Sequence, residues 1–154
     1  MPKVLFVCLG NICRSPTAEG VFIHLLQQQG CMEQFVVDSA GTSAYHVGEG
    51  ADKRSIAAAN KRGIHLPSIA RQFVVQDFDA FDVIVAMDHS NKQNILSLAR
   101  NSVDVDKVHL FRDFDSTSPK GSSVPDPYYE NNFDEVVDIC IRGCEGMITH
   151  FATQ

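Results

Sequence analysis

The chain of 154 residues contains no tryptophan, only three tyrosines and no excess of basic residues. Thirteen Lys and Arg against nineteen Asp and Glu give a formal net charge of −6. A general nucleic-acid binder needs a basic face to displace counterions, so this charge argues against one. No apolar run is long enough for a signal-peptide core or a membrane span. We therefore expect a cytoplasmic protein that does not insert into membranes.

The five cysteines are an odd number without the regular spacing of a disulfide framework, which fits a reducing compartment. The six histidines show no ligand spacing, so we expect neither a metal nor another cofactor. A chain of this length can bury a core without disulfides. We predict one domain spanning residues 1–154.

Short apolar runs alternate with amphipathic stretches along the chain. Strands are predicted at 3–8, 35–39, 81–87 and 107–111, and helices from Ser15 to Gly30 and at 52–62, 91–99 and 132–151. We expect Ser15 to cap the first helix and Pro16 to occupy its first position. Residues 112–127 contain three prolines and a glycine and are predicted as a loop. The alternation indicates an α/β fold with a parallel sheet.

Five residues separate Cys8 from Arg14 in a segment between the first strand and the first helix. Ligands of parallel sheets bind at the carboxyl ends of strands, where this segment lies. A loop this short can turn its N–H groups inward, and Gly10 and Asn11 tolerate the unusual dihedrals required. The helix N-terminus and the Arg14 fork add positive charge, which also stabilises a thiolate at Cys8. The predicted phosphate-binding residues are Leu9, Gly10, Asn11, Ile12, Cys13, Arg14 and Ser15.

The spacing of Cys8 and Arg14 alone is weak evidence because it arises often by chance. The alternative is that Cys8 is a small buried hydrophobe and Arg14 a surface charge. The segment lacks the Gly-Lys-Ser/Thr ending of a Walker loop, so it is not one. Its placement between a buried strand and a helix favours a phosphate loop.

The run VCLGNICRSPTAE, residues 7–19, resembles the phosphate loop of the low-molecular-weight protein tyrosine phosphatases. The resemblance continues, in the same order, through DSAGT at 38–42, ARQ at 70–72, Met87-Asp88, Ser90-Asn91 and VPDPYY at 124–129. It implies a flavodoxin-like four-stranded parallel sheet with helices on both faces. It also implies a metal-independent reaction through a phosphocysteine.

The resemblance implies a role for each residue of the loop and for one residue outside it. Cys8 is the nucleophile, and Arg14 binds the phosphoryl group through the transition state. Ser15 hydrogen-bonds the thiolate, while Asn11 and Ser39 brace the loop. Many relatives carry His at the position of Ser68, where it helps the bracing; this chain lacks that group.

Asp126, between two prolines, is the general acid that the resemblance implies. An ester oxygen is a poor leaving group unless it is protonated, and the same carboxylate can then activate water. A purely structural Pro-Asp-Pro turn is the alternative.

Three tyrosines are the expected substrate pocket: Tyr45, Tyr128 and Tyr129. Many relatives have Trp at the place of Tyr45, and ordinary half-buried packing is the alternative for each tyrosine. The implied substrates are phosphotyrosine proteins or small aryl phosphates, with phosphate or vanadate as inhibitors.

Three other functions compete with this one. Thioredoxin-coupled arsenate reductases also use a Cys-x5-Arg loop but need further cysteines, and residues 88–94 contain none. Protein arginine phosphatases have Thr at the place of Ile12 and lack the aromatic pair after Asp126. A non-catalytic phosphate-binding module would lose the nucleophile or the acid, yet Cys8 and Asp126 are both present.

Overall fold

Four parallel strands form one sheet in the order β2-β1-β3-β4 in the computed structural model, which describes residues 2–152. The strands are β1 Lys3–Cys8, β2 Val36–Gly41, β3 Val83–Ala86 and β4 Val108–Leu110. This is the flavodoxin-like order, which confirms the predicted fold class. The chain leaves β1 toward β2 on one side and later returns to β3 on the other side. The crevice at the carboxyl end of β1 is therefore the expected ligand site.

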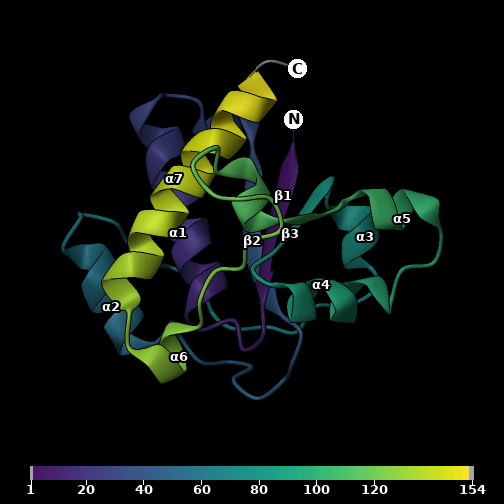
Figure 1. The fold of residues 1–154 in the computed structure, drawn as a ribbon, viewed down its shortest axis with the longest axis horizontal. Helices are drawn as coiled ribbons and strands as arrows, with labels where there is room; N and C mark the ends of the chain where they lie inside the picture. Colours follow the sequence, from purple (N-terminus) through teal and green to yellow (C-terminus); the bar gives the residue numbers. More distant parts are fainter. Residues whose placement is uncertain (1, 153–154) are drawn as a thin grey trace.

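Helices cover both faces of the sheet (Figure 1). One face packs against α1 Arg14–Gln28, α2 Lys53–Asn60 and α7 Phe133–Ala152, and the other against α3 Asp77–Ala80 and α4 His89–Leu96. The short α5 Ser102–Asp106 contacts β4 at the edge of the sheet. In β1, Val4 and Phe6 join the core under α1 and α7, whereas Leu5 and Val7 join the opposite core. Burial on both faces explains the uninterrupted apolar run of this strand.

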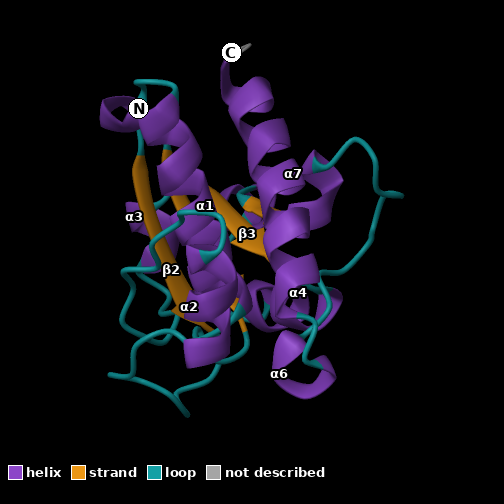
Figure 2. Cartoon of the chain, turned by 90° about the vertical axis from the view of Figure 1, so that its left-hand side faces the viewer, coloured by secondary structure: helices purple, strands orange, loops and turns teal. Residues whose placement is uncertain are grey.

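The short α6, Pro127–Glu130, lies below the main helix layer, near the carboxyl ends of the strands (Figure 2). With α3 and α5 it was not predicted, because four or five residues are too short to show a helical period. A 3₁₀ helix, Phe111–Phe114, also interrupts the predicted loop 112–127, and another spans Met32–Gln34. No helix among residues 2–152 has the length and apolar character needed to cross a bilayer.

The start of α1 differs from the prediction. The helix begins at Arg14, with Cys13 as its N-cap and no side-chain capping bond, so Ser15 is not the cap and Pro16 is the third residue. Proline is tolerated there because N–H groups of the first turn have no intrahelical acceptor. Gly30, at φ +69°, follows the helix as predicted. The Ser15 hydroxyl is used inside the site instead.

Candidate active site

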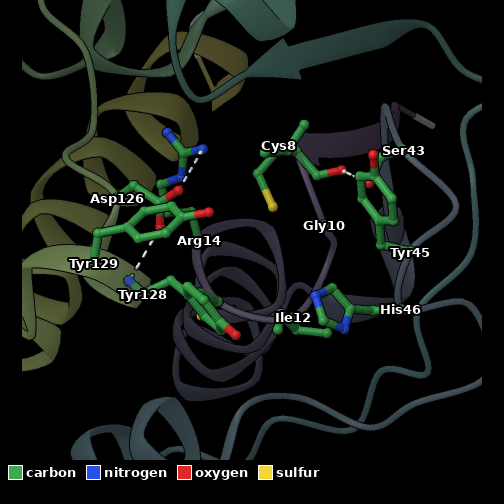
Figure 3. A pocket seen from close by; sticks show the side chains of 12 residues that line it. Cys8, Gly10, Ile12, Arg14, Ser43, Tyr45, His46, Asp126, Tyr128 and Tyr129 are labelled. Atoms are coloured by element: carbon green, nitrogen blue, oxygen red, sulfur yellow. Dashed lines mark hydrogen bonds and ion pairs between the residues drawn. The ribbon is translucent and has the colours of Figure 1, made fainter.

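A cavity of about 170 Å³ opens at the carboxyl end of β1 (Figure 3). Most predicted site residues line it: Cys8, Leu9, Gly10, Ile12, Cys13, Arg14, Tyr45, Asp126, Tyr128 and Tyr129. Asn11, Ser15 and Ser39 are buried and do not line it. Ser43 and His46 also line the cavity and were not predicted, since their Gly- and Ser-rich loop carries no chemical pattern.

The floor of the cavity is the loop after β1, and several of the carbonyl groups at and around this loop are already engaged by neighbouring segments. Four of them accept backbone hydrogen bonds from outside the loop: Cys8 from Thr42 at 2.9 Å, Leu9 from Ser43 at 2.9 Å, Ile12 from Asp52 at 2.8 Å and Cys13 from Thr17 at 3.2 Å. Among the hydrogen bonds of the described residues, no backbone N–H of residues 9–13 is a donor. These N–H groups therefore remain available to an anion, next to the N-terminus of α1.

The loop depends on one left-handed residue and two glycines. Asn11 has φ +56°, the conformation that asparagine tolerates best among residues with a Cβ. Gly10 has no positive φ, so the expectation of an unusual dihedral there is wrong; a Cβ on it would instead lie 3.0 Å from Cδ2 of His46. A Cβ on Gly41 would lie 2.8 Å from the Leu9 carbonyl oxygen. Gly41 is therefore needed for the close approach of β2 to the loop backbone, whereas a side chain at Gly10 would require the His46 ring to shift.

The Asn11 amide fixes the direction of the hydrogen bonds behind the loop. Its Oδ1 accepts from the Arg71 N–H at 3.0 Å, so its Nδ2 is the donor to Ser15 Oγ at 2.8 Å and Ser39 Oγ at 2.9 Å. The Ser15 hydroxyl can then give its one proton to Cys8 Sγ at 3.0 Å or to the Ala40 carbonyl at 3.4 Å, and the sulfur is the nearer of the two. The network therefore places a hydroxyl donor beside the Cys8 sulfur.

Glu19 closes the other end of the network. The Ser39 hydroxyl donates to its Oε1 at 2.6 Å. Burial raises the pKa of Glu19 to about 7. The hydrogen bond from Ser39 lowers this pKa, but by less than burial raises it. Ser68 Oγ is buried and makes no hydrogen bond of standard geometry among the described residues, although it lies close enough to Glu19 to help lower the pKa of that carboxyl. The Ser15–Asn11–Ser39 bonds thus form without the histidine of many relatives.

The Arg14 guanidinium is buried and held on two sides. Its Nη1 lies 2.6 Å from Asp88 Oδ2 and donates to the Val124 carbonyl at 3.1 Å, while Nη2 lies 3.6 Å from Asp126 Oδ2. Burial alone would lower the pKa of Arg14, but Cys8, Asp88 and Asp126 raise it. A role for Asp88 was not predicted, although its position two residues after the end of β3, the strand beside β1, was a usable signal.

Asp126 reaches the cavity from the N-terminus of α6. Its Oδ1 accepts from the Tyr128 N–H at 3.1 Å, and Pro127 occupies the first helical position. This capping bond directs the second carboxylate oxygen toward Arg14. In Figure 3 the carboxylate lies across the cavity from the loop and beside Arg14.

The aromatic side chains stand at two sides of the opening, with Tyr45 opposite Tyr128 and Tyr129 (Figure 3). The Arg54 guanidinium carbon lies 5.4 Å from the centre of the Tyr128 ring and 4.6 Å from the centre of the Phe133 ring. These two contacts help hold the Tyr128 ring in place. Tyr45 and Tyr129 are 86% and 78% exposed, so most of their ring surface is free for a ligand. The three tyrosines predicted to form the substrate pocket, Tyr45, Tyr128 and Tyr129, therefore lie around one opening in the fold.

All five cysteines are free thiols, and only Cys8 and Cys13 line the described cavity. Burial raises the pKa of Cys13 to about 12, and burial also raises the pKa values of Cys140 and Cys144. Within residues 2–152, no group of three or more His, Cys, Asp or Glu side chains is arranged to hold a metal ion.

Fold and site together define an α/β protein with an anion cradle beside a cysteine. Residues 3–154 match the family model described as low molecular weight phosphotyrosine protein phosphatase. The low molecular weight phosphotyrosine protein phosphatase of Homo sapiens is 41% identical over 150 residues, which cover 95% of this chain and 93% of the human protein. The chain therefore belongs to the low molecular weight phosphotyrosine protein phosphatase family, whose members are hydrolases.

Solved structures agree with this assignment. A protein tyrosine phosphatase from Entamoeba histolytica superimposes with a TM-score of 0.93 at 41% identity, over 99% of this chain and 98% of that one. The Drosophila arginine phosphatase superimposes with a TM-score of 0.88 at 29% identity, over 98% of each chain. Substrate choice therefore has to be argued from the site.

Proposed function

We propose that the chain hydrolyses phosphotyrosine and small aryl phosphates through a phosphocysteine on Cys8, with Asp126 as general acid and then general base. The observation that carries this proposal is that three kinds of group adjoin one cavity. They are the free N–H groups of residues 9–13, the buried Arg14 guanidinium and the Cys8 sulfur. Fixed donors of this kind stabilise the charge on the equatorial oxygens of a transferring phosphoryl group.

In the first step the Cys8 thiolate attacks phosphorus and the P–O ester bond breaks. The electron pair of that bond goes to the phenolic oxygen, which takes a proton from Asp126. The position of Asp126 across the cavity suits this role, because the leaving oxygen must lie opposite the attacking sulfur.

In the second step a water oxygen attacks the phosphocysteine and the S–P bond breaks. Asp126, now a carboxylate, takes a proton from the water, and the products are inorganic phosphate and the free Cys8 thiolate. Because Asn11 donates to Ser15, the Ser15 hydroxyl can donate to the departing sulfur. Ser15 thus lowers the cost of regenerating the thiolate.

The aromatic rim supports an aryl ester as the substrate class. Tyr45 and Tyr129 offer exposed ring surface on opposite sides of the opening, and Tyr128 forms a fixed wall. Ring contacts of this kind favour a planar aromatic leaving group. Phosphate and vanadate have the shape and charge that the cradle accepts, and we expect both to compete with substrate.

The test is steady-state hydrolysis, with EDTA present, of p-nitrophenyl phosphate and of matched phosphotyrosine, phosphoserine and phosphoarginine peptides. The proposal predicts turnover of both aryl esters, little turnover of phosphoserine, and loss of activity in Cys8→Ser. Preference for phosphoarginine would place the chain with the arginine phosphatases, and substantial turnover by Cys8→Ser would exclude the covalent route.

A further inference from the structure

Arg112 differs from the other arginines in its charge balance. Each of the other six lies within 3.2 Å of an aspartate carboxylate: Arg14, Arg54, Arg62, Arg71, Arg100 and Arg142. Arg112, in the 3₁₀ helix Phe111–Phe114, takes part in none of the ion pairs found among the described residues. It is a cation whose charge no neighbouring carboxylate neutralises directly.

Neutral oxygens hold the Arg112 guanidinium in place. Nε and Nη2 donate to Ser118 Oγ at 3.2 and 2.9 Å, and Nη1 donates to the Ser123 carbonyl at 3.0 Å. The nearest carboxylate in this network is Asp115, which accepts from Ser118 and is paired with Arg142. One N–H of each terminal nitrogen of Arg112 has no acceptor among these bonds. The fork is therefore positioned in advance and still has two donors to offer.

Arg112 lines an open groove that adjoins the catalytic cavity. Ser123, Pro125, Asp126, Tyr129 and Glu130 line the same groove, and Asp126 and Tyr129 also line the cavity. Both shared residues stand on one side of the cavity in Figure 3. A peptide whose phosphotyrosine occupies the cavity can therefore extend past Tyr129 into this groove.

We propose that Arg112 binds an anionic side chain of the substrate peptide close to the phosphotyrosine, either a carboxylate or a second phosphate. This inference rests on the proposed function, because it places the phosphotyrosine in the cavity. A guanidinium with two free donors matches two oxygens of such a group. Glu130 and Asp126, on the same groove, oppose the anion, so a single acidic residue gains less there than it would beside Arg112 alone.

The test compares kcat/KM for phosphotyrosine peptides of equal length. One has alanine on both sides, one has aspartate on the N-terminal side, one has aspartate on the C-terminal side, and a fourth replaces the preferred aspartate with phosphoserine. The parent protein should prefer one aspartate peptide over the alanine peptide by about 3–10-fold, the range expected of a partly exposed charged contact. A still higher value for the phosphoserine peptide would identify a second phosphate as the better occupant.

Three variants assign any preference to the groove. Arg112→Gln should reduce the aspartate-to-alanine ratio to about one, and using the ratio cancels any general effect on the loop. Lys120→Gln removes the same charge from the same loop but lies outside the groove, and should keep the ratio. Glu130→Gln removes the opposing charge at an exposed position and should raise the ratio about twofold.

An unchanged ratio for both aspartate peptides in Arg112→Gln overturns the inference, and so does the absence of any preference in the parent. If Arg112→Gln does not fold, the Glu130→Gln variant decides: an aspartate-to-alanine ratio equal to that of the parent also overturns the inference. Failure of the proposed function would appear separately, as no turnover of p-nitrophenyl phosphate. In that case the dissociation constants of the same peptides with Cys8→Ser, compared with Cys8→Ser plus Arg112→Gln, give the same ratio without catalysis.

Discussion

Oδ2 of Asp126 lies 3.6 Å from Nη2 of Arg14, so the proposed acid forms an ion pair with the arginine proposed to bind the phosphate, on one side of the cavity. If Asp126 protonates the leaving oxygen, its loss must matter most for the most basic leaving group. Phosphotyrosine leaves as a phenoxide of pKa about 10. Asp126→Asn should lower the first-step rate for phosphotyrosine by about 10²–10⁴-fold, the usual contribution of general acid catalysis.

The measurement is the single-turnover burst across aryl phosphates of rising leaving-group pKa. The first-step rate should fall much less for esters with a stable phenolate than for phosphotyrosine. Plots of that rate against leaving-group pKa for the parent and for Asp126→Asn should therefore diverge. Asparagine can still accept the capping bond from Tyr128 through its Oδ1, so α6 should stay in place. Parallel lines would mean that Asp126 acts only as the cap of α6.

The exposed Tyr45 ring should contribute to aryl binding and little to the chemistry. Tyr45→Ala should raise KM for aryl esters by about 3–10-fold, because one ring contact is lost. The rate on small alkyl phosphates should fall much less. Tyr45→Phe is the matched control and should behave like the parent. An unchanged aryl preference in Tyr45→Ala would place Tyr45 outside the substrate contact.

Glu19 should make stability depend on pH. Its pKa rises from 4.5 to about 7 on folding, so the folded state favours the protonated form. The stabilisation is complete below about pH 4.5 and is lost as the pH rises through about 7. It amounts to on the order of 3 kcal/mol, at 1.36 kcal/mol per pKa unit.

Glu19→Gln keeps an acceptor for the Ser39 hydroxyl and removes the titration. Denaturant unfolding should show equal stability of Gln and parent near pH 4.5, and greater stability of Gln at pH 8. Glu33→Gln, at an exposed position, should show no such difference. A parent and a Gln variant with parallel stability curves from pH 4.5 to 8 would refute the buried titration.

Cys13 should protect an oxidised nucleophile. Peroxide oxidises the Cys8 sulfur to a sulfenic acid, and attack by Cys13 on that sulfur forms a disulfide and releases water. Burial raises the pKa of Cys13 to about 12, so disulfide formation should accelerate as the pH rises. Dithiothreitol should restore activity in the parent and much less in Cys13→Ser. Equal recovery would show that Cys13 only packs the loop.

The contiguous parts of the site could be predicted from sequence, because strand, loop and helix follow one another in residues 3–28. β1 shows the two-sided burial in its composition, and the cysteine and arginine of the cradle lie in one short segment. Tyr45 and Asp126 could be placed only through the family resemblance, since no local pattern ties them to the loop.

The remainder depends on contacts between distant residues. Asp88 lies 74 positions from Arg14, and Glu19 lies 20 positions from Ser39. Neither of these two pairings is visible in a local sequence pattern. Ser15 has the composition of a cap, but Cys8 and Asn11 engage its hydroxyl instead. The sequence predicts an unusual backbone dihedral at Gly10, whereas in the structure the missing side chain leaves space for the His46 ring. Local rules fail here because tertiary partners bind the same groups more favourably.

The covalent intermediate is the most direct test of this account. The protein is mixed with a radiolabelled aryl phosphate, quenched in acid within the first turnover and digested, and the label is located by peptide mapping. We predict label on the peptide that contains Cys8, more of it in Asp126→Asn because the second step is slower, and none in Cys8→Ser. Turnover by the parent without label on that peptide, or with label on another residue, would contradict the account.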